Sequence, residues 1–497
     1  MEQMARPIAG SMADRYCILC LVFCTVATSV AAQPLHMALD EVLELGLPVV
    51  EVVTVDSIEP TAERIEAPDY CPVGRSITNA TKVPGRLAVW EADGRLRYES
   101  LLYRKERSGM TIKIRGNNSG LWTPPPYKVK LEKKADLLGR GDETKYADKH
   151  WLLLREWRQT LNIPIGLKVN ELLGLSWTPA CEHVNLFMNG KYRGVYLLTE
   201  QVRRNPRCRI DVDKETGFIV ERDIYWWNEP VSFETTMVNT FWQRFTFKYP
   251  DEDDVTDAQV AAAQAAVNRM EAAIADGTYD EFIDVRSFAA WHLGHDILGT
   301  YDCSGANQFY SKRDDTDDSR ITLGPLWDFD TNFYQQDEWS RFHDSGSYLQ
   351  PLLKSPNKAF AKALVRRWEE LSPILVERMM VYLDSLEASP AGQGITRSRQ
   401  LLRPTSYVST HENVEEAREW FSTRKEWLDV HIAEIDTMDA SPVAAPNEER
   451  EDGAIYDLAG RRWPAHQRKE LPTGVYILNA KKVRVIQQSA VRTQGKG

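Results

Sequence analysis

The sequence predicts an α+β protein with a β-rich N-terminal lobe and a helical C-terminal lobe. One observation is a series of short β-branched or alternating runs, typical of strands. They occupy residues 47–55, 85–91, 110–115, 127–131, 184–188 and 192–198, with helical pieces around 148–175. The other is a change after Asp257 to alanine-rich segments with a 3.6-residue period, which indicates helices. These segments cover about 257–276, 285–300, 357–386 and 412–436.

Local signals support individual elements. Asn189-Gly190 separates two of the strand-like runs and favours a tight hairpin, because both turn residues must tolerate positive φ. Thr256 and Asp284 directly precede helical segments and are plausible N-cap residues.

The first 32 residues have the features of an export signal. Arg6 and Arg15 precede an apolar run, residues 16–32, that ends in small residues. The run is short for a membrane-spanning helix, so cleavage is favoured over a retained anchor. We therefore expect an exported protein, on the cell surface or secreted, without an integral membrane body.

Charge and cysteine content exclude other classes. The 497-residue chain has 61 Lys and Arg against 72 Asp and Glu, a net charge of −11, which disfavours general binding to nucleic acid. After the signal, Cys71, Cys181, Cys208 and Cys303 remain, far apart and without a C-x-x-C pair, so a zinc site is not expected. Export permits disulfides, but the sequence does not choose among the three possible pairings.

Residues 103–134 form a basic segment within this acidic chain, with nine Lys or Arg against two Glu. Arg115 opens the loop RGNNSG directly after a strand-like run, and such a loop can bring backbone N–H groups close to a phosphate. In the run YKVKL that follows, alternation places Lys128 and Lys130 on one face and the apolar residues on the other. Either lysine is a candidate phosphate contact.

Acidic and amide side chains recur between residues 299 and 333. Asp302 and Asn307 have the spacing D-x4-N, and LWDFD, with Asp328 and Asp330, follows about twenty residues later. Phosphoryl transfer uses divalent ions held by hard oxygen ligands and a carboxylate aimed at the attacking hydroxyl. These four residues supply such groups.

Together these segments resemble the CotH kinase family of spore-coat protein H and its relatives, which have an atypical protein-kinase-like fold. The matching segments are RGNNSG, YKVKL, NGKYRGVYLLTEQV from Asn189, GFIVERD from Gly217, the loop 302–307 with FYSKRD after it, and LWDFD. The resemblance covers about residues 47–345, with helices to about 437. It implies a kinase-like domain over 33–440, with an N-lobe at about 47–200 and a C-lobe at about 201–437.

The resemblance also implies roles for individual residues. Asp302 matches the catalytic-loop aspartate and Asn307 the asparagine beside it that helps to hold metal. Asp328 matches the metal-binding aspartate, with Asp330 as a helper. Lys128 or Lys130 matches a family lysine that contacts phosphate, and Glu200 and Glu221 are both candidates for its acidic partner. Arg115 lies in the nucleotide loop, but Leu121-Trp122 replaces the basic residue that usually follows it.

The expected activity is transfer of the γ-phosphoryl group of ATP, with Mg²⁺ or Mn²⁺, to a hydroxyl of a surface or secreted protein. The alternative is a non-catalytic surface scaffold or adhesive protein that keeps the fold. The sequence does not indicate the phosphoacceptor or the oligomeric state.

The C-terminus predicts a separate small module. Residues 441–453 are rich in Pro, Ala and acids and predict a linker. Residues 454–488 contain alternating runs and the patterns YDLxGRR and PxGVYIxN, which resemble the C-terminal sorting modules of exported Bacteroidetes proteins.

Overall fold

The structure is a computed structural model that forms two compact units, Met1–Asp439 and Ala440–Gly497. It describes residues 35–69, 75–77, 81–117, 119–155, 161–237, 243–300, 303, 307–334, 348–402, 408–437 and four short strands between 455 and 485. The predicted export signal, residues 1–32, and the predicted linker, 441–453, lie outside these residues. No helix of the described part is both long and apolar enough to cross a membrane.

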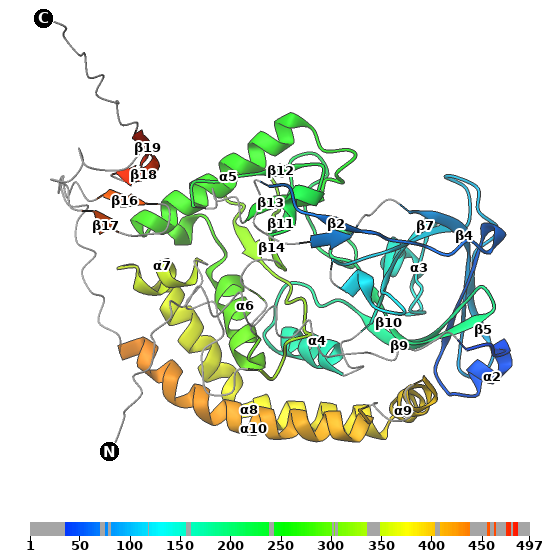
Figure 1. Cartoon of the computed structure of the whole chain (residues 1–497). Coiled ribbons are helices and arrows are strands. Elements are labelled where there is room, and N and C mark those ends of the chain that lie inside the picture. Colours follow the sequence, from blue (N-terminus) through cyan, green and yellow to red (C-terminus); the bar gives the residue numbers. More distant parts are fainter. Residues whose placement is uncertain are drawn as a thin grey trace, which may run out of the picture. The chain divides into compact units, whose positions relative to one another are not determined.

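The larger unit contains an eight-stranded sheet in the order β1-β9-β10-β8-β7-β6-β4-β5. Its strands are β1 (Val49–Thr54), β4 (Val83–Trp90), β5 (Leu96–Glu99), β6 (Met110–Ile114), β7 (Tyr127–Ala135), β8 (Asp148–Leu154), β9 (Cys181–Met188) and β10 (Lys191–Glu200). Because β1 pairs with β9 on one side and with β4 on the other, the sheet closes into a barrel. Figure 1 labels β4, β5, β7, β9 and β10 of this sheet at one end of the unit.

Strand alternation decides which side chains fill the barrel. Val129 and Leu131 of β7 are fully buried with Ile112 and Trp151 from the neighbouring strands. Lys128 and Lys130 therefore lie on the outer face, as the alternation of YKVKL predicts. The hairpin between β9 and β10 is also confirmed, since Asn189 and Gly190 have φ values of 51° and 73°.

A second sheet has the order β12-β13-β11-β14-β15. Its strands are β11 (Phe218–Asp223), β12 (Ser232–Phe233), β13 (Arg244–Tyr249), β14 (Gln308–Lys312) and β15 (Ile321–Leu323). The sequence prediction of a helical second lobe missed this sheet, because its strands are short and helices α5 and α6 separate β13 from β14 in the chain. The α+β class itself is confirmed.

Helices α5, α6, α8 and α10 follow predicted segments closely, and α4 lies within the predicted region 148–175, whose first residues instead form strand β8. Helix α9 was not predicted. The long ones are α4 (Asn162–Leu172), α5 (Asp257–Asp276), α6 (Val285–Leu298), α8 (Ala359–Ala388), α9 (Pro390–Leu402) and α10 (Thr410–Thr437). Both N-caps are confirmed: Thr256 Oγ1 accepts a hydrogen bond from the backbone N–H of Gln259, and Asp284 accepts from two N–H groups of α6. The short elements are α2 (Leu39–Leu43), α3 (Glu143–Tyr146), α7 (Leu349–Lys354), β2 (Arg64–Glu66) and β3 (Arg75–Ile77).

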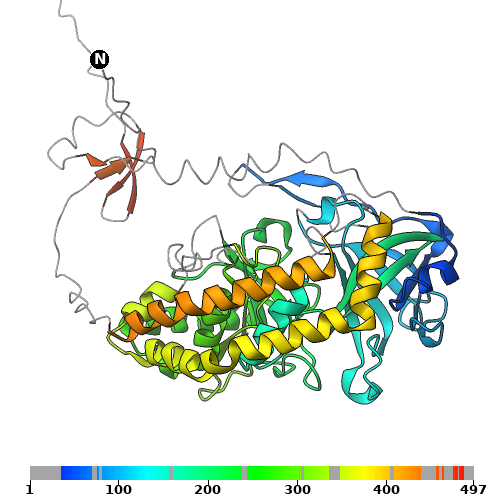
Figure 2. The ribbon, with the colours of Figure 1, turned by 90° about the horizontal axis from the view of Figure 1, so that it is seen from below.

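Helix α6 lies at the centre of the larger core, and every residue from Phe288 to Leu298 is buried. Helices α8 and α10 run side by side beneath it (Figures 1 and 2). At the C-terminal end of α6, Trp420 Nε1 donates to the Ile297 carbonyl at 2.9 Å and Arg424 Nε donates to the Asp296 carbonyl at 2.7 Å. These donors satisfy carbonyls that a helix end leaves without intrahelical partners.

The smaller unit contains a four-stranded antiparallel sheet in the order β17-β16-β18-β19. The strands are β16 (Ile455–Asp457), β17 (Arg462–Trp463), β18 (Gly474–Leu478) and β19 (Lys481–Val485). Strands β16, β18 and β19 coincide with the alternating runs of the sequence, whereas β17 was not predicted. A sorting role for the module stays a prediction.

Candidate active site

A cavity of about 380 Å³ lies where the barrel meets the second sheet and α4. The loop after β6, the end of β8, strand β11 and the LWDFD segment after β15 all contribute to its wall. Five of the residues predicted from the sequence line it: Arg115, Glu221, Asn307, Asp328 and Asp330. Residues from distant parts of the chain therefore meet in one cavity.

Asn307 and Asp328 are joined directly. Asn307 Nδ2 donates to Asp328 Oδ2 at 2.8 Å, and the Asn307 backbone N–H donates to Glu221 Oε1 at 3.0 Å. Both residues have left-handed backbone conformations, with φ values of 65° and 63°. Asn and Asp tolerate this region better than other non-glycine residues, and such strain persists only where the surroundings fix it.

Helix α4 fixes the LWDFD segment at two points. Asn170 Oδ1 accepts from the Leu326 backbone N–H at 2.9 Å, while Asn170 Nδ2 donates to the Trp177 carbonyl at 3.0 Å. Phe329 is buried and lies against Gly166, where an added Cβ would come within 2.1 Å of the Phe329 ring. Asp328 lies between these two contacts, so the position of its carboxylate depends on α4.

A lysine that the sequence analysis missed balances the acidic wall. Lys248 Nζ lies 2.8 Å from Glu221 Oε2. Burial of Lys248 opposes its charge, but Glu221, Glu229 and Asp223 outweigh burial and raise the lysine pKa. Burial raises the pKa of Asp223 to about 7, Glu221 acts in the same direction, and Lys248 opposes them. Strand alternation could have indicated this site, because it places the carboxylates of Glu221 and Asp223 on one face of β11, where a nearby cation is needed.

Two arginines add positive charge to the cavity. Burial lowers the pKa of Arg115, while Asp328, Glu221 and Asp330 oppose that shift and favour the charged form. Arg155, at the end of β8, is buried and donates to the Pro124 carbonyl at 3.0 Å. The cavity thus holds cations and carboxylates together, the combination that binds a metal and a phosphate.

Other predicted residues lie elsewhere. Glu200 is buried beside Arg140 at 3.1 Å and Arg209 at 3.5 Å, and it accepts from the Ala180 backbone N–H at 3.0 Å. Lys128 and Lys130 line a neighbouring groove. In the structure Glu221 pairs with Lys248 on the adjacent strand β13, and Glu200 pairs with arginines, rather than with Lys128 or Lys130.

Two predictions from the sequence depend on residues outside the described part of the chain. Asp302, the predicted base, lies outside the described residues, although Cys303 next to it is described and buried. Cys71 is also outside them, so the disulfide pairing stays open, and the thiol of Cys208 is free.

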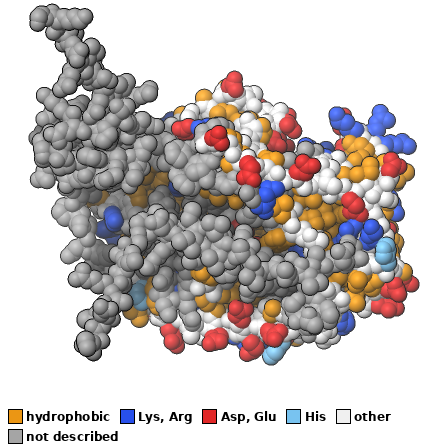
Figure 3. All heavy atoms as spheres, in the orientation of Figure 1, with side chains coloured by type: hydrophobic (Ala, Val, Ile, Leu, Met, Phe, Trp, Pro, Cys, Tyr) orange, Lys and Arg blue, Asp and Glu red, His pale blue; other side chains and the backbone are white. Residues whose placement is uncertain are grey.

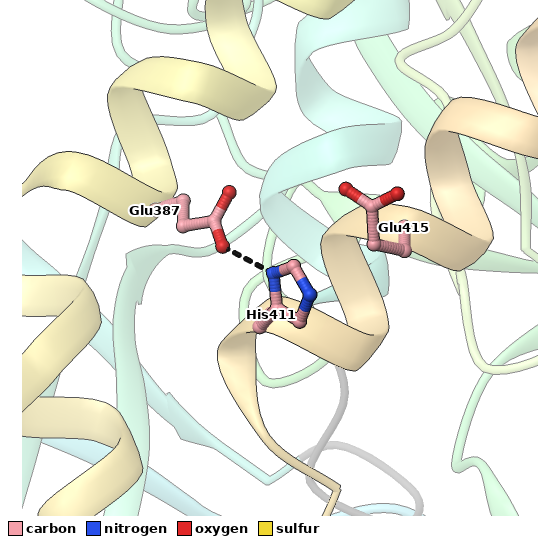
Figure 4. A group of neighbouring side chains, drawn as sticks. All are labelled: Glu387, His411 and Glu415. Atoms are coloured by element: carbon pink, nitrogen blue, oxygen red, sulfur yellow. Dashed lines mark hydrogen bonds and ion pairs between the residues drawn. The ribbon is translucent and has the colours of Figure 1, made fainter.

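One further cluster has the side chains of a metal site. Glu387, His411 and Glu415 lie where the end of α8 meets the start of α10 (Figure 4). His411 Nδ1 is 2.6 Å from Glu387 Oε1, and Glu387 raises the pKa of His411. Arg418 lies 3.0 Å from Glu415 and 3.6 Å from Glu387. A cation therefore already neutralises this cluster, which ties the two helices together.

The fold and cavity define an α+β protein in which carboxylates, an amide and basic side chains meet in one cavity. The family model described as CotH kinase protein matches residues 112–428, more than half of the chain. The chain therefore belongs to the CotH kinase protein family.

The other comparisons add little. No curated protein matches the chain. One solved structure is "Shewanella oneidensis MR-1 Toxin Antitoxin System HipA, HipB and its operator DNA complex", with 14% identity and a TM-score of 0.26. The match covers 58% of this chain and 60% of that chain. The family assignment rests on the family model alone.

Proposed function

We propose that the protein is a phosphotransferase that moves the γ-phosphoryl group of ATP to a hydroxyl group of a protein. The observation that carries this proposal is the pair Asn307 and Asp328, held at 2.8 Å in a cavity that also contains Asp330 and Arg115. Membership of the CotH kinase protein family supports the same reaction.

The donor atoms fit a Mg²⁺ or Mn²⁺ ion. Asn307 uses its amide nitrogen on Asp328, which leaves its side-chain oxygen for a ligand. That oxygen and the carboxylates of Asp328 and Asp330 are hard donors of the kind these ions prefer. The bound ion would supply positive charge against the phosphate oxygens.

The chain's own cations complete the binding of the nucleotide. Arg115 follows β6 and faces the carboxylates of the cavity, so it is well placed to bind a phosphate oxygen with its planar guanidinium. Lys248, which lines the same cavity, is held by Glu221. We assign phosphate contact to Arg115 and a charge-balancing role to Lys248, and Asp302 remains the proposed base.

The acceptor is proposed to be a surface or secreted protein. The basis is the export-signal pattern of residues 1–32 and the C-terminal pattern that resembles sorting modules. Detection of the chain in the culture medium or surface fraction of its host, with residues 1–32 removed, tests this part.

Thermal unfolding tests the nucleotide site. A ligand that binds only the folded state at 100 times its Kd stabilises it by about 2.7 kcal/mol. We expect ATP with Mg²⁺ or Mn²⁺ to raise the Tm of the chain, and Asp328→Asn to abolish the shift. Asp314→Asn is the matched control, because Asp314 lies in an exposed turn. Absence of a shift with either metal would refute the proposal and favour the non-catalytic scaffold.

A further inference from the structure

A second, smaller hollow lies beside the active-site cavity. This basic groove has a volume of about 220 Å³ and shares Arg115, Glu229 and Lys248 with the cavity. Its remaining wall comes from the outer faces of β6, β7 and β8 and from residues 201–203 and 247–253. A ligand in the groove would therefore lie next to the reacting groups.

Four lysines line the groove without a matching acid. Lys82, Lys113, Lys128 and Lys130 form no ion pair with any residue in the described part of the chain. Lys113 and Lys128 are directly opposite each other in the antiparallel pair of β6 and β7. Like charges at directly opposite positions destabilise a sheet. The repulsion between Lys113 and Lys128 therefore destabilises the protein while the groove is empty, and a bound anion would relieve it.

Lys128 and His150 also indicate that the groove has positive charge without a matching anion. Burial lowers the pKa of Lys128 to about 7, and Arg203 and Lys113 add to the shift. His150 lies opposite Lys130, and its Nδ1 is buried without a hydrogen-bond partner. Burial and the neighbouring cations, Arg203 first, lower the His150 pKa. A bound anion would reverse both shifts by supplying negative charge.

The acids of the groove do not cancel this charge. Asp251 forms an ion pair with Arg203. Burial raises the pKa of Glu229, and Glu252 beside it acts in the same direction against Lys248. The four lysines thus remain in excess over Glu252 and Asp253.

We propose that the basic groove is a second anion site, which binds a phosphorylated or carboxylate-rich segment of the acceptor polypeptide beside the catalytic cavity. The identity of the ligand as an acceptor rests on the proposed function. The nucleotide fits the groove less well, because its charge lies in the triphosphate, which must reach Asn307 and Asp328 in the cavity. An uncharged base gains nothing from four lysines. An extended polypeptide can contact both hollows through their shared residues.

Binding of a synthetic phosphoserine peptide to the full chain, measured by calorimetry without nucleotide, tests this proposal. The double variant Lys113→Met, Lys128→Met keeps most of the apolar length of both side chains and removes their charge. We expect its affinity for the peptide to fall by about tenfold or more, because two charge-assisted contacts with the anion are lost. The matched control is Lys105→Met, Lys133→Met, because both of these lysines are exposed outside the groove.

A second pair of measurements separates the groove from the cavity. Lys113→Arg, Lys128→Arg should retain peptide binding. The methionine variant should keep or raise its Tm, because it removes the repulsion between the two lysines, and a Tm that does not fall excludes unfolding as the cause. In a phosphotransfer assay with the phosphoserine peptide as acceptor, the methionine variant should have a higher KM for the peptide and an unchanged KM for ATP.

Three outcomes would overturn the proposal. A rise in the KM of ATP with unchanged peptide affinity would assign the groove to the nucleotide. Binding of inorganic pyrophosphate as tight as that of the peptide would make it a site for small anions. Equal affinity of the methionine and control variants for the peptide would show that Lys113 and Lys128 do not contribute to binding. Because peptide binding is measured without ATP, the absence of phosphotransfer would refute the proposed function and leave this result standing.

Discussion

The contact between Gly166 and Phe329 makes a specific prediction about how α4 supports the site. Alanine in a helix interior is usually more stable than glycine by about 1 kcal/mol. At Gly166, however, the new Cβ would lie 2.1, 2.4 and 2.6 Å from three atoms of the buried Phe329 ring. Overpacking of this kind costs about 1–3 kcal/mol. Gly166→Ala should therefore leave the net free energy of unfolding between unchanged and about 2 kcal/mol lower.

The effect on the site should exceed the effect on stability. Phe329 follows Asp328 directly, so displacement of the ring moves the carboxylate that Asn307 holds. We expect Gly166→Ala to reduce the ATP-dependent rise in Tm even where the variant remains folded. The assay is urea denaturation for stability, combined with thermal unfolding with and without ATP and Mg²⁺.

A double-mutant cycle isolates the contact. Phe329→Leu alone leaves space in the core and should destabilise the protein. Combined with Gly166→Ala, the smaller side chain should accommodate the new methyl group, so the double variant should be more stable than the sum of the single effects by about 1 kcal/mol. Additive effects, or an unchanged response to ATP in Gly166→Ala, would refute the argument.

Three more variants test the electrostatics of the cavity. Asn307→Asp would place a carboxylate against Asp328 and Glu221, and we expect loss of phosphotransfer in a radiolabelled-phosphate assay; full activity would contradict the assigned pairing. Lys248→Met would leave Glu221 without its partner, with an expected loss of about 3 kcal/mol in urea denaturation at neutral pH; a loss below 1 kcal/mol would contradict the charge-balancing role. The raised pKa of Asp223, about 7, means that the folded state holds a proton that the unfolded state has released above about pH 4, so this group's contribution to stability should fall as pH rises from about 4 to 7. Asp223→Asn should flatten that part of the stability profile, and an unaltered slope would assign it to another group.

Local patterns predicted much of the fold. The alternation in YKVKL placed Lys128 outside the barrel and Val129 inside it, and the hairpin at Asn189 and the helix start at Thr256 follow from the chemistry of a few adjacent residues. The second sheet was not predictable in this way, because its central pairing joins β11 to β14, which lie far apart in the chain.

The site shows the same limit. The spacing and the family resemblance identified Asn307 and Asp328 as candidates, and the structure joins them. The sequence did not show whether Glu221 or Glu200 pairs with a lysine, because this depends on which neighbouring strand carries the nearest cation. Lys248 lies on β13 beside β11, whereas Glu200 lies beside Arg140 and Arg209. Such pairings depend on tertiary packing rather than on local sequence.

The surface of the larger unit also carries local positive charge. In Figure 3, Lys and Arg side chains gather toward the end of the molecule where Figure 1 labels β4 and β7. A protein of net charge −11 thus presents locally positive surface, and its association with acidic partners should weaken with added salt.

The two donors at the end of α6 set the smallest fragment that can fold with an intact site. Trp420 and Arg424 belong to α10, more than a hundred residues after the carbonyls of Asp296 and Ile297 that they satisfy. A fragment that stops after LWDFD would contain every candidate ligand of the site, yet it would leave the end of its central helix without these partners and its apolar faces without cover. For this chain, the domain that carries the candidate site therefore extends through α10, and any shorter truncation intended for expression should aggregate.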